Sequence, residues 1–398
     1  MLTVDEALGR LMDGMHLTDG ERVSLADALG RVPGASAVVS AIDVPPFANS
    51  AMDGYALRSA DGVGPRRVVG ESRAGGPPAP HVEAGTAARI MTGAPVPDGA
   101  DTVVPIEEAT DRDGMVMVAA APAPGTHIRP AALDIRAGEQ VPLPRLPLGS
   151  SAIGLLAALG TAGLEVRRRP RVAILSTGDE LRDVGASLGL GQIYDANAPA
   201  LAAAVTEAGG EPVILDRAPD QPDVIERTLR LAVEFADLLI VSGGVSVGGH
   251  DHVRGAIERL GTLDFWRIAV QPGKPLAFGR IGDVPVIGLP GNPVSALVTF
   301  ELFVRPMLRA MLGMAGDGRL RVRARVSEAI GKDPARRAYL RVRIERSSDG
   351  YAATSSGGQG SSQLLPLALA NGLLVVPEGV PSTEPGREYE AILLGGTE

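Results

Sequence analysis

The sequence predicts a multidomain α/β-plus-β protein built around a Rossmann-like, doubly wound parallel α/β domain. The chain has 398 residues, more than one ordinary domain of roughly 100–200 residues. From residue 170 onwards, short β-branched runs alternate with amphipathic segments, which is typical of a parallel sheet with helices on both faces. Elsewhere, stretches dense in Pro and Gly with short apolar runs favour small all-β domains.

These changes in texture predict four domains. A helix-containing N-terminal domain is expected to be interrupted by an inserted β-rich domain, because helix-compatible sequence resumes only after a long stretch dense in turns. The Rossmann-like domain follows, and a β-barrel-like domain ends the chain. The expected limits are 1–41 with 138–169 for the N-terminal domain, 42–137 for the inserted domain, 170–316 for the Rossmann-like domain and 317–398 for the C-terminal all-β domain.

The first residues predict a helix rather than a targeting segment. "MLTVDEALGRLMDGM" places Thr3 three residues before Glu6, the spacing of a capping box, and lacks the basic start and apolar core of a signal peptide. The most apolar segment, "AIGLLAALGTAGL", is too short and too interrupted by glycine to span a bilayer. Cysteine is absent, which excludes disulfides and thiolate metal ligands. A cytoplasmic protein with no membrane partner is expected.

Helices and strands of the Rossmann-like domain are predicted from periodicity. "RVAILST" predicts a strand, and "NAPALAAAVTEAGG" predicts a helix with Asn197 as its N-cap. "PDVIERTLRLAVEFA" repeats apolar residues at Ile225, Leu229 and Val233, which gives one buried stripe. A further helix is expected over 251–260, and the last one is expected to kink at Pro306.

Charge narrows the class of ligand. The chain has 38 basic and 47 acidic residues, a net charge of -9, and only 3% aromatic residues. No basic block with interleaved aromatic residues appears, so nucleic acid is not expected as a partner. A protein this acidic needs local positive groups or a bound cation wherever its ligand is an anion.

Three predicted strand ends carry the chemistry. In open α/β sheets, ligands bind beyond the carboxyl ends of the strands, and here those ends read "STGDE", "SGGVSVGGHD" and "GLPGNPVS". Backbone N–H groups and hydroxyls at helix starts form anion sites. The carboxylates of Glu180 and Asp251 would repel an anion unless a hard cation such as Mg²⁺ lay between them. A phosphate-bearing ligand is therefore expected, with Glu180 and Asp251 as metal ligands. The other residues expected to line the loops are Ser176, Thr177, Gly178, Ser242, Gly243, Gly244, Gly291 and Asn292.

Each of these residues also has a purely structural interpretation. Asp251 suits a helix N-cap as well as a metal ligand, and Glu180 taken alone suits a solvated turn. Asn292 suits the N-cap of the last helix, and Asp220 suits the N-cap of the "PDVIERT" helix. "HDH" could hold zinc, but no third ligand is evident. No Walker motif is present, which disfavours ATP binding of that type.

Two further stretches add polar groups. "QPGKPLAFG" places Lys274 in a Gly/Pro turn, with Arg267 before it; Lys274 could bind an anion or be a solvated loop charge. "PPFANSAMDGYAL" combines a proline bend with a polar cluster that includes Asp53, which could equally be an Asx-turn.

Taken together, six motifs identify a family. "FANSAMDGYA", "ARIMTGAPVPDGADTVV", "STGDEL", "SGGVSVGGHD", "QPGKPLAFG" and "GLPGNPVSA", in this order, closely resemble the molybdopterin molybdenumtransferases, which are similar to the C-terminal domain of gephyrin. The resemblance covers essentially the whole chain. It implies a homodimer of four-domain chains that takes adenylylated molybdopterin and molybdate, inserts the metal at the dithiolene and releases AMP in a Mg²⁺-dependent step.

The resemblance also implies roles for individual residues. The motifs of the second domain and its junction carry over Asp53 and Asp134 as catalytic, and Thr92 and Arg129 as substrate-binding. Glu180 and Asp251 are implied as the catalytic, magnesium-proximal carboxylates. Residues implied as part of the substrate site in the Rossmann-like domain are Asp220, Ser246, Arg267, Lys274, Pro290 and Pro293. Arg341 of "YLRVR" and Ser361 of "GQGSS" match residues that the dimer partner contributes to the cleft.

The sequence departs from the family in two places. Gln271 stands where many members have Lys, so an anion is expected to depend more on Lys274; Arg267 replaces another Lys and keeps the charge. Gly249 and His250 replace the commoner acidic residue before Asp251, which leaves Asp251 as the expected carboxylate.

Three alternatives remain at this stage. The chain could be a molybdopterin adenylyltransferase, although that enzyme has neither the N-terminal nor the tail domain, or a non-catalytic pterin-binding or scaffold protein. Tungstate could replace molybdate as the oxyanion. Transient contacts with the adenylyltransferase and with molybdoenzymes are implied as well.

Overall fold

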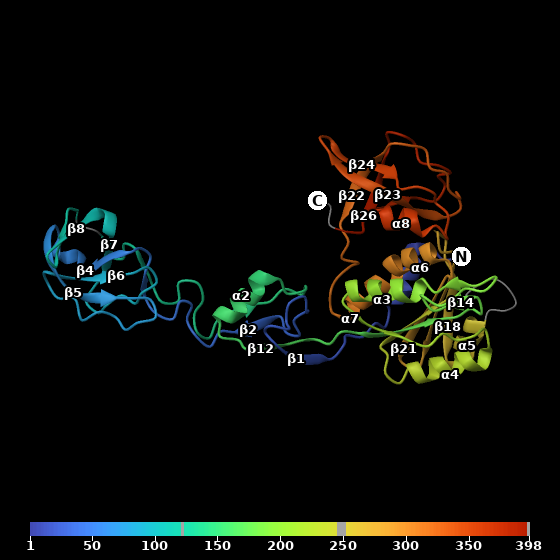
Figure 1. The fold of residues 1–398 in the computed structure, drawn as a ribbon, viewed down its shortest axis with the longest axis horizontal. Helices are drawn as coiled ribbons and strands as arrows, with labels where there is room; N and C mark the ends of the chain where they lie inside the picture. The colour runs from blue at the N-terminus through green and yellow to red at the C-terminus, as the bar shows by residue number, and fades with distance from the viewer. Residues whose placement is uncertain (121–122, 245–251, 396–398) are drawn as a thin grey trace. The chain divides into compact units, whose positions relative to one another are not determined.

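The computed structural model describes residues 1–120, 123–244 and 252–395. The chain divides into two compact units: Met1–Glu21 together with Arg167–Glu398 form one, and Arg22–Val166 form the other (Figure 1). The first unit contains the Rossmann-like sheet and a β-barrel, and the second contains the Pro- and Gly-rich β structure. This architecture confirms the predicted fold class.

The central sheet of the first unit has six strands in the order β16-β13-β17-β21-β20-β18. The first four strands are parallel, as predicted, whereas β20 and β18 run antiparallel. The antiparallel edge arises because β20 and β21 are joined by a tight turn at Gly282, which has a positive φ of 59°. The strands are β13 (Arg171–Ser176), β16 (Glu211–Ile214), β17 (Leu238–Ser242), β18 (Thr262–Arg267), β20 (Pro275–Ile281) and β21 (Val284–Leu289).

Helices cover both faces of this sheet (Figure 1). Successive strand residues alternate between two cores: Val172 and Ile174 pack with α3 and α6, whereas Ala173 and Leu175 pack with α4 and α5. The predicted apolar stripe of α4 is confirmed, since Ile225 is fully buried. The helices of this domain are α1 (Val4–Met12), α3 (Asn197–Glu207), α4 (Pro222–Ala232), α5 (His252–Leu260), α6 (Pro293–Thr299) and α7 (Arg305–Met311).

Three helix starts test the predicted caps. The capping box of Thr3 and Glu6 at α1 is confirmed. The prediction that Asn197 is an N-cap is wrong: the Asp195 carboxylate accepts the backbone N–H groups of Asn197 and Ala198, each at 3.0 Å. An anionic carboxylate is a stronger acceptor than an amide, and its position two residues earlier leaves the Asn197 side chain available for other contacts.

The cap interpretation of Asp220 is also wrong. The N-cap position of α4 is occupied by Gln221, and no side chain caps the helix. The helix begins at Pro222, as the quoted segment predicted, and the Asp220 backbone instead donates to Asp179 Oδ1 at 3.2 Å.

The last helix of the domain is interrupted before its proline. A π-helical turn, η3 (Phe300–Val304), separates α6 from α7. Pro306 has no N–H to donate to the preceding turn, so the chain widens locally instead of simply kinking at Pro306.

A closed barrel follows in the same unit. Pairing of β23 with both β24 and β25 closes five strands in the cyclic order β23-β24-β22-β26-β25, which confirms the predicted barrel-like tail. Its elements are β22 (Arg321–Val326), β23 (Arg337–Ser347), β24 (Gly350–Ser355), α8 (Leu364–Leu369), β25 (Gly372–Val376) and β26 (Glu388–Leu393), and β19 (Val270–Gln271) adds to its edge.

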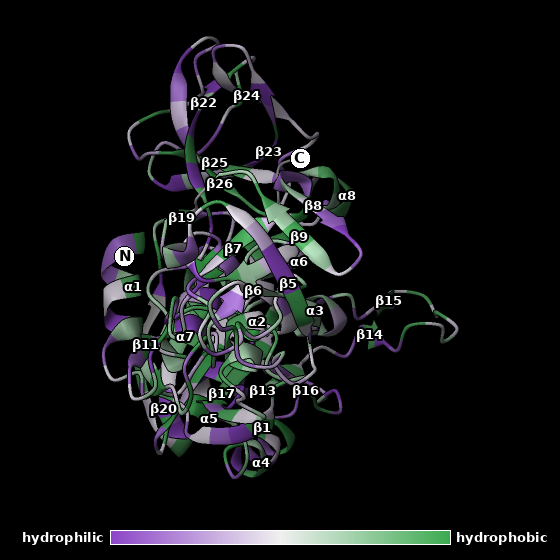
Figure 2. Ribbon diagram, turned by 90° about the vertical axis from the view of Figure 1, so that its left-hand side faces the viewer, coloured by the Kyte–Doolittle hydropathy of each residue, from purple (hydrophilic) through white to green (hydrophobic). Residues whose placement is uncertain are grey.

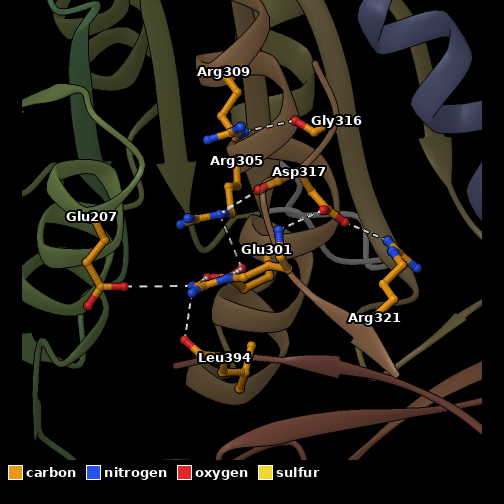
Figure 3. Close-up of polar contacts among 9 residues, drawn as sticks. Glu207, Glu301, Arg305, Arg309, Gly316, Asp317, Arg321 and Leu394 are labelled. Carbon is orange, nitrogen blue, oxygen red and sulfur yellow. Dashed lines mark hydrogen bonds and ion pairs between the residues drawn. The ribbon is translucent and has the colours of Figure 1, made fainter. Parts of the chain in front are cut away.

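Arginines hold the linker between the Rossmann-like domain and the barrel (Figure 3). Arg319 makes a bidentate contact with Glu301 at 2.9 and 2.6 Å and donates to the Leu394 carbonyl at 2.6 Å. Arg305 donates to the Asp317 carbonyl at 2.8 Å. These contacts join η3, α7, the linker and the end of β26, so they fix the barrel on the Rossmann-like domain.

A short pair of strands extends from the Rossmann-like domain. β14 (Leu181–Arg182) and β15 (Ile193–Tyr194) are parallel, and the loop between them reaches away from the sheet (Figure 2). The pair connects the end of β13 to the start of α3.

The second unit has several small cores. One gathers Ala28, Leu148 and Leu156, so residues from both ends of the unit pack together. Another lies in a six-stranded sheet of order β7-β4-β6-β5-β9-β8 and includes Tyr55 and Val116. The sheet strands are β4 (Gly54–Leu57), β5 (Gly64–Ser72), β6 (Thr86–Ile90), β7 (Thr102–Pro105), β8 (Ala109–Arg112) and β9 (Met115–Val118). The other elements are β2 (Ala37–Val39), β3 (Asn49–Ser50), β10 (Ile128–Arg129), β11 (Gln140–Pro142) and α2 (Ser150–Ala158). β1 (Gly20–Ser24) pairs with β12 (Gly163–Arg167) where the two units meet in sequence.

Within the described part of the chain, no helix has both the length and the apolarity needed to cross a membrane.

Candidate functional site

Strand order places a topological switch point between β13 and β17. From β13 the chain continues to β16 on one side and then to β17 on the other, so the connections diverge at this point. Such switch points are where open α/β sheets bind ligands, beyond the carboxyl ends of the strands. The three predicted loops, after β13, β17 and β21, all lie at this edge, since Ser176, Ser242 and Leu289 are in register.

The loop after β13 brings two hydroxyls to this edge. The Thr177 backbone donates to the Ser242 carbonyl at 3.0 Å, which ties the first loop to the second. The side-chain oxygens of Ser176 and Thr177 are buried and have no hydrogen-bond partner among the residues that the structure describes. A buried polar group without a partner is costly, so these hydroxyls are natural contacts for a ligand or for water.

The loop after β17 requires glycine. Gly243 and Gly244 have φ values of 92° and 67°, which L side chains rarely adopt. A Cβ on Gly243 would lie 2.6 Å from the Thr177 carbonyl oxygen, and one on Gly244 would lie 2.5 Å from Val253 of α5. The glycines therefore allow the first two loops and α5 to pack at close range, with backbone N–H groups left at the edge.

The loop after β21 is held by its neighbours. Gly243 donates to the Leu289 carbonyl at 3.2 Å, and a Cβ on Gly291 would lie 3.6 Å from the Gly243 Cα. Asn292 occupies the N-cap position of α6 and Pro293 its first helical position, as predicted, although the Asn292 side chain makes no cap hydrogen bond. Pro290 is buried beside them.

The barrel of the same chain reaches this loop. The Val294 backbone, in the first turn of α6, donates to the Ser361 carbonyl at 3.1 Å. Arg341 lies beneath the loop that carries Ser361: its Nη2 donates to the carbonyls of Gly358 and Gly360, both at 3.1 Å. The Arg341 side chain is only 1% exposed, and this burial lowers its pKa to about 10. In this conformation Arg341 supports the loop and is shielded from a ligand.

Only some of the candidate metal ligands lie among the residues that the structure describes. Glu180 is exposed, and its carboxylate has no partner among the described residues; it lies close to Gly178, where an added Cβ would come within 2.6 Å of Oε2. A free carboxylate oxygen is the type of ligand that Mg²⁺ prefers, so Glu180 fits the expected ion. Ser246, His250 and Asp251 lie outside the described residues. Among the residues that are described, no three His, Cys, Asp or Glu side chains gather as a metal site.

Basic residues flank the sheet on the β18–β20 side. Arg267 ends β18, Lys274 precedes β20, and both side chains are exposed. Gln271 accepts a hydrogen bond from the Asp333 backbone at 2.9 Å, so its side chain joins this turn to the barrel.

The second unit brings together another pair. Asp53 Oδ1 accepts hydrogen bonds from the Thr92 backbone at 2.6 Å and from its hydroxyl at 2.7 Å. These bonds, the backbone one first, lower the pKa of Asp53 below its ordinary value. Arg129 pairs with Asn49 in the neighbouring β10–β3 ladder and is exposed. Asp134 is also exposed, and its backbone donates to Val44 at 2.9 Å, so its carboxylate faces solvent without a described partner.

Comparison with known proteins decides the family. Three family models match in succession: the MoeA N-terminal region (domain I and II) over residues 2–160, a probable molybdopterin binding domain over 173–310, and the MoeA C-terminal region (domain IV) over 323–394. The molybdopterin molybdenumtransferase of Haemophilus influenzae is 40% identical over 317 residues, which cover 79% of this chain and 78% of that protein. Molybdopterin molybdenumtransferase 2 of Mycobacterium tuberculosis is 39% identical over 382 residues, covering 92% and 93% of the two chains.

The chain belongs to the molybdopterin molybdenumtransferase family. A solved MoeA protein of Pyrococcus horikoshii has the same fold, with a TM-score of 0.87, 34% identity and full coverage of both chains. The family suggested by the six motifs is thus confirmed, as is the fold class.

One residue of this molybdopterin molybdenumtransferase family member was not predicted as part of the site. Asn197, at the start of α3, donates from Nδ2 to the Ser242 hydroxyl at 2.7 Å and to the Gly291 carbonyl at 2.8 Å. Its sequence position suited a helix cap, which obscured this role. The nearby Asp195 was the available clue, because two good capping residues compete for one helix start and only one is needed.

Proposed function

We propose that this chain is a molybdopterin molybdenumtransferase of molybdenum cofactor biosynthesis. It inserts molybdate into adenylylated molybdopterin and releases AMP in a Mg²⁺-dependent step. The observation that carries the proposal is the meeting of three strand-end loops at the switch point, with two buried hydroxyls that have no partner in the described part of the chain. Membership of the family supplies the substrate class.

The loops suit an anionic substrate that brings its own sulfur. The backbone N–H group of Gly244 and the hydroxyls of Ser176 and Thr177 are donors of the type that phosphate requires. The dithiolene of the pterin supplies both sulfurs, so a chain without cysteine is compatible with this chemistry. Lys274 and Arg267 are proposed to guide the oxyanion, with Pro290 and Pro293 shaping the third loop.

Glu180 and Asp251 are proposed to hold the magnesium ion. When bound, Mg²⁺ polarises the phosphoanhydride and offsets its charge. Asp220 is proposed to lie near the same phosphates, because its backbone is tied to the loop after β13 through Asp179. Ser246 is proposed to belong to the cradle.

Further parts of the proposal come from the family. Asp53 and Asp134 are proposed as catalytic and Thr92 and Arg129 as substrate-binding, and the chain is proposed to work as a cytoplasmic homodimer. Arg341 and Ser361 are proposed to belong to the part of the substrate cleft that the dimer partner contributes, Arg341 by supporting the loop that carries Ser361. We also propose that the chain has four domains, with the limits 1–41 with 138–169, 42–137, 170–316 and 317–398. Transient contacts with the adenylyltransferase and with molybdoenzymes are proposed as well.

The test is molybdate-dependent AMP release from adenylylated molybdopterin. Glu180→Ala and Asp251→Ala are each expected to lose most of the Mg²⁺-dependent activity, whereas Asp349→Ala, an exposed acid in a turn of the barrel, serves as the matched control. Full activity in both site variants would refute the metal assignment. ATP consumption with metal-free molybdopterin, in the absence of AMP release, would instead support an adenylyltransferase.

A further inference from the structure

The side-chain amide of Asn197 is fully committed as a donor. One Nδ2 hydrogen goes to the Ser242 hydroxyl oxygen at 2.7 Å and the other to the Gly291 carbonyl at 2.8 Å. Because the Gly291 carbonyl can only accept, a flipped amide would set oxygen against oxygen there, so this contact determines the orientation of the group. Asp195 also holds the Asn197 backbone at 3.0 Å.

These bonds connect separate loops. Ser242 ends β17, Gly291 follows β21, and Asn197 begins α3, which follows the loop from β13 by way of β14 and β15. The β17–β21 ladder joins Ser242 to Leu289 through the backbone, but no strand pairing joins Asn197 to either loop. The amide is therefore a side-chain cross-link that fixes the start of α3 against the second and third loops.

The hydrogen bond from Asn197 also affects which group the Ser242 hydroxyl can donate to. Ser242 Oγ accepts from Asn197, and its own hydroxyl hydrogen has no acceptor among the described residues. Ser176 and Thr177, in the adjoining loop, likewise have hydroxyls without partners. An anion requires donors, and Ser242 Oγ, which uses one lone pair to accept the Asn197 N–H, keeps its own hydroxyl hydrogen available for a further acceptor.

We propose that Asn197 is a positioning residue of this site: it ties the start of α3 to the loops after β17 and β21 and orients the Ser242 hydroxyl, whose hydrogen is left to donate to the phosphate-bearing ligand. The inference rests on the proposed function for the class of ligand. Asn197 acts through Ser242 and Gly291 and does not itself contact the reacting atoms.

Four variants test the proposal. Asn197→Asp has the same shape and keeps an acceptor oxygen, but it loses both donors and adds a negative charge. Asn197→Ala and Ser242→Ala remove the two ends of the bond, and their double variant tests whether they act together. Thr206→Ala is the control: Thr206 lies at the far end of α3 and bonds only to the Ala202 carbonyl, at 3.0 Å.

Turnover and melting are measured together. Asn197→Ala is expected to lower kcat about 100-fold with little change in melting temperature, since loss of the cross-link misplaces the substrate without removing core contacts. Asn197→Asp is expected to raise KM as well, because its charge repels the anion. The double variant is expected to be no worse than the worse single variant, and Thr206→Ala is expected to match wild type.

Three results would overturn the proposal. Wild-type turnover in Asn197→Asp would mean that only its acceptor oxygen matters. Losses that multiply in the double variant would mean that Asn197 and Ser242 act independently. A lower melting temperature with unchanged kcat per folded molecule would make Asn197 merely structural.

A binding measurement separates this proposal from the proposed function. If wild type itself releases no AMP from the adenylylated pterin, the proposed function fails, but calorimetric titration with AMP and Mg²⁺ still probes the loops. Asn197→Ala is then expected to bind AMP about tenfold more weakly than wild type, the equivalent of one lost charge-assisted hydrogen bond. Equal affinity, or no binding by wild type, would count against the role of Asn197.

Discussion

Removing the charge of Glu301 is expected to destabilise the junction between the Rossmann-like domain and the barrel (Figure 3). The side chains of Glu301 and Arg319 are only 14% and 13% exposed, and two hydrogen bonds at 2.9 and 2.6 Å join them. Glu301→Gln keeps the shape but leaves the Arg319 guanidinium without its counter-charge.

The size of the effect follows from what Arg319 retains. Breaking one partner of a buried pair costs about 3–5 kcal/mol. Arg319 keeps its bond to the Leu394 carbonyl at 2.6 Å, and Glu207 lies 3.8 Å away on the surface, with 67% of its side chain exposed. These contacts offset part of the loss, so the expected cost is about 2–3 kcal/mol. For a domain of this size that corresponds to a melting temperature lower by about 4–10 °C.

Differential scanning calorimetry of the whole chain measures this shift. The matched control is Glu388→Gln, which breaks a contact with Arg325 on the barrel surface, where the side chains are 46% and 53% exposed and 3.6 Å apart. An exposed pair is worth about 0–1 kcal/mol, so the control is expected to melt within about 2 °C of wild type.

A double-mutant cycle isolates the pair. Arg319→Gln alone leaves Glu301 unpaired, apart from Arg305 at 3.9 Å, and is also expected to be destabilising. The two single losses are expected to sum to more than the loss in the double variant, because each includes the cost of an unpaired buried charge. If Glu301→Gln melts within error of the Glu388→Gln control, the junction does not depend on this pair and the reasoning is wrong.

Three further predictions concern other parts of the chain. Gly244→Ala is expected to cost about 1–3 kcal/mol and to abolish AMP release, because a φ of 67° strains any L side chain; thermal unfolding and turnover check it. NMR titration is expected to place the pKa of Asp53 below its ordinary value, and Thr92→Ala is expected to raise it; Asp53 thus favours the folded state at neutral pH and loses that contribution only as the pH falls through the lowered pKa. Asp237→Asn is expected to cost about 1–3 kcal/mol by denaturant unfolding, since its carboxylate holds both Nη atoms of Arg168 at 2.7 and 2.8 Å.

The sequence predicted the sheet and its loops because both depend on local pattern. Strand and helix periods place hydrophobic residues on opposite faces, and chain order alone then brings the loops after β13, β17 and β21 to one edge. The antiparallel β20 could not be predicted as readily: a buried strand has the same apolar composition in either direction, and only the Gly282 turn distinguishes them.

Side-chain roles near helix starts were the least predictable. Asn197, Asp220 and Asn292 all have residue types that suit caps, yet only Asn292 occupies the N-cap position, and it makes no cap bond. Short polar side chains have several acceptors and donors within reach, and which one they choose depends on residues distant in sequence. The partners of Asn197 are 45 and 94 residues away, so no local pattern could identify them.

The described loops that are proposed to bind an anion carry no cations of their own. Residues 176–178, 242–244 and 290–292 contain no Lys or Arg, and they follow strands of a protein with a net charge of -9. Fixed N–H and O–H dipoles favour an anion only at short range and only in the correct orientation, whereas an ammonium or guanidinium attracts any anion from a distance. Selectivity for an anion at this edge would therefore depend on how accurately the loops are held. The groups that hold the loops are the positive-φ glycines and the side-chain amide of Asn197, and none of them is charged. Arg267 and Lys274 lie on the neighbouring β18–β20 side, so attraction of the ligand and its recognition are assigned to different elements of the same sheet.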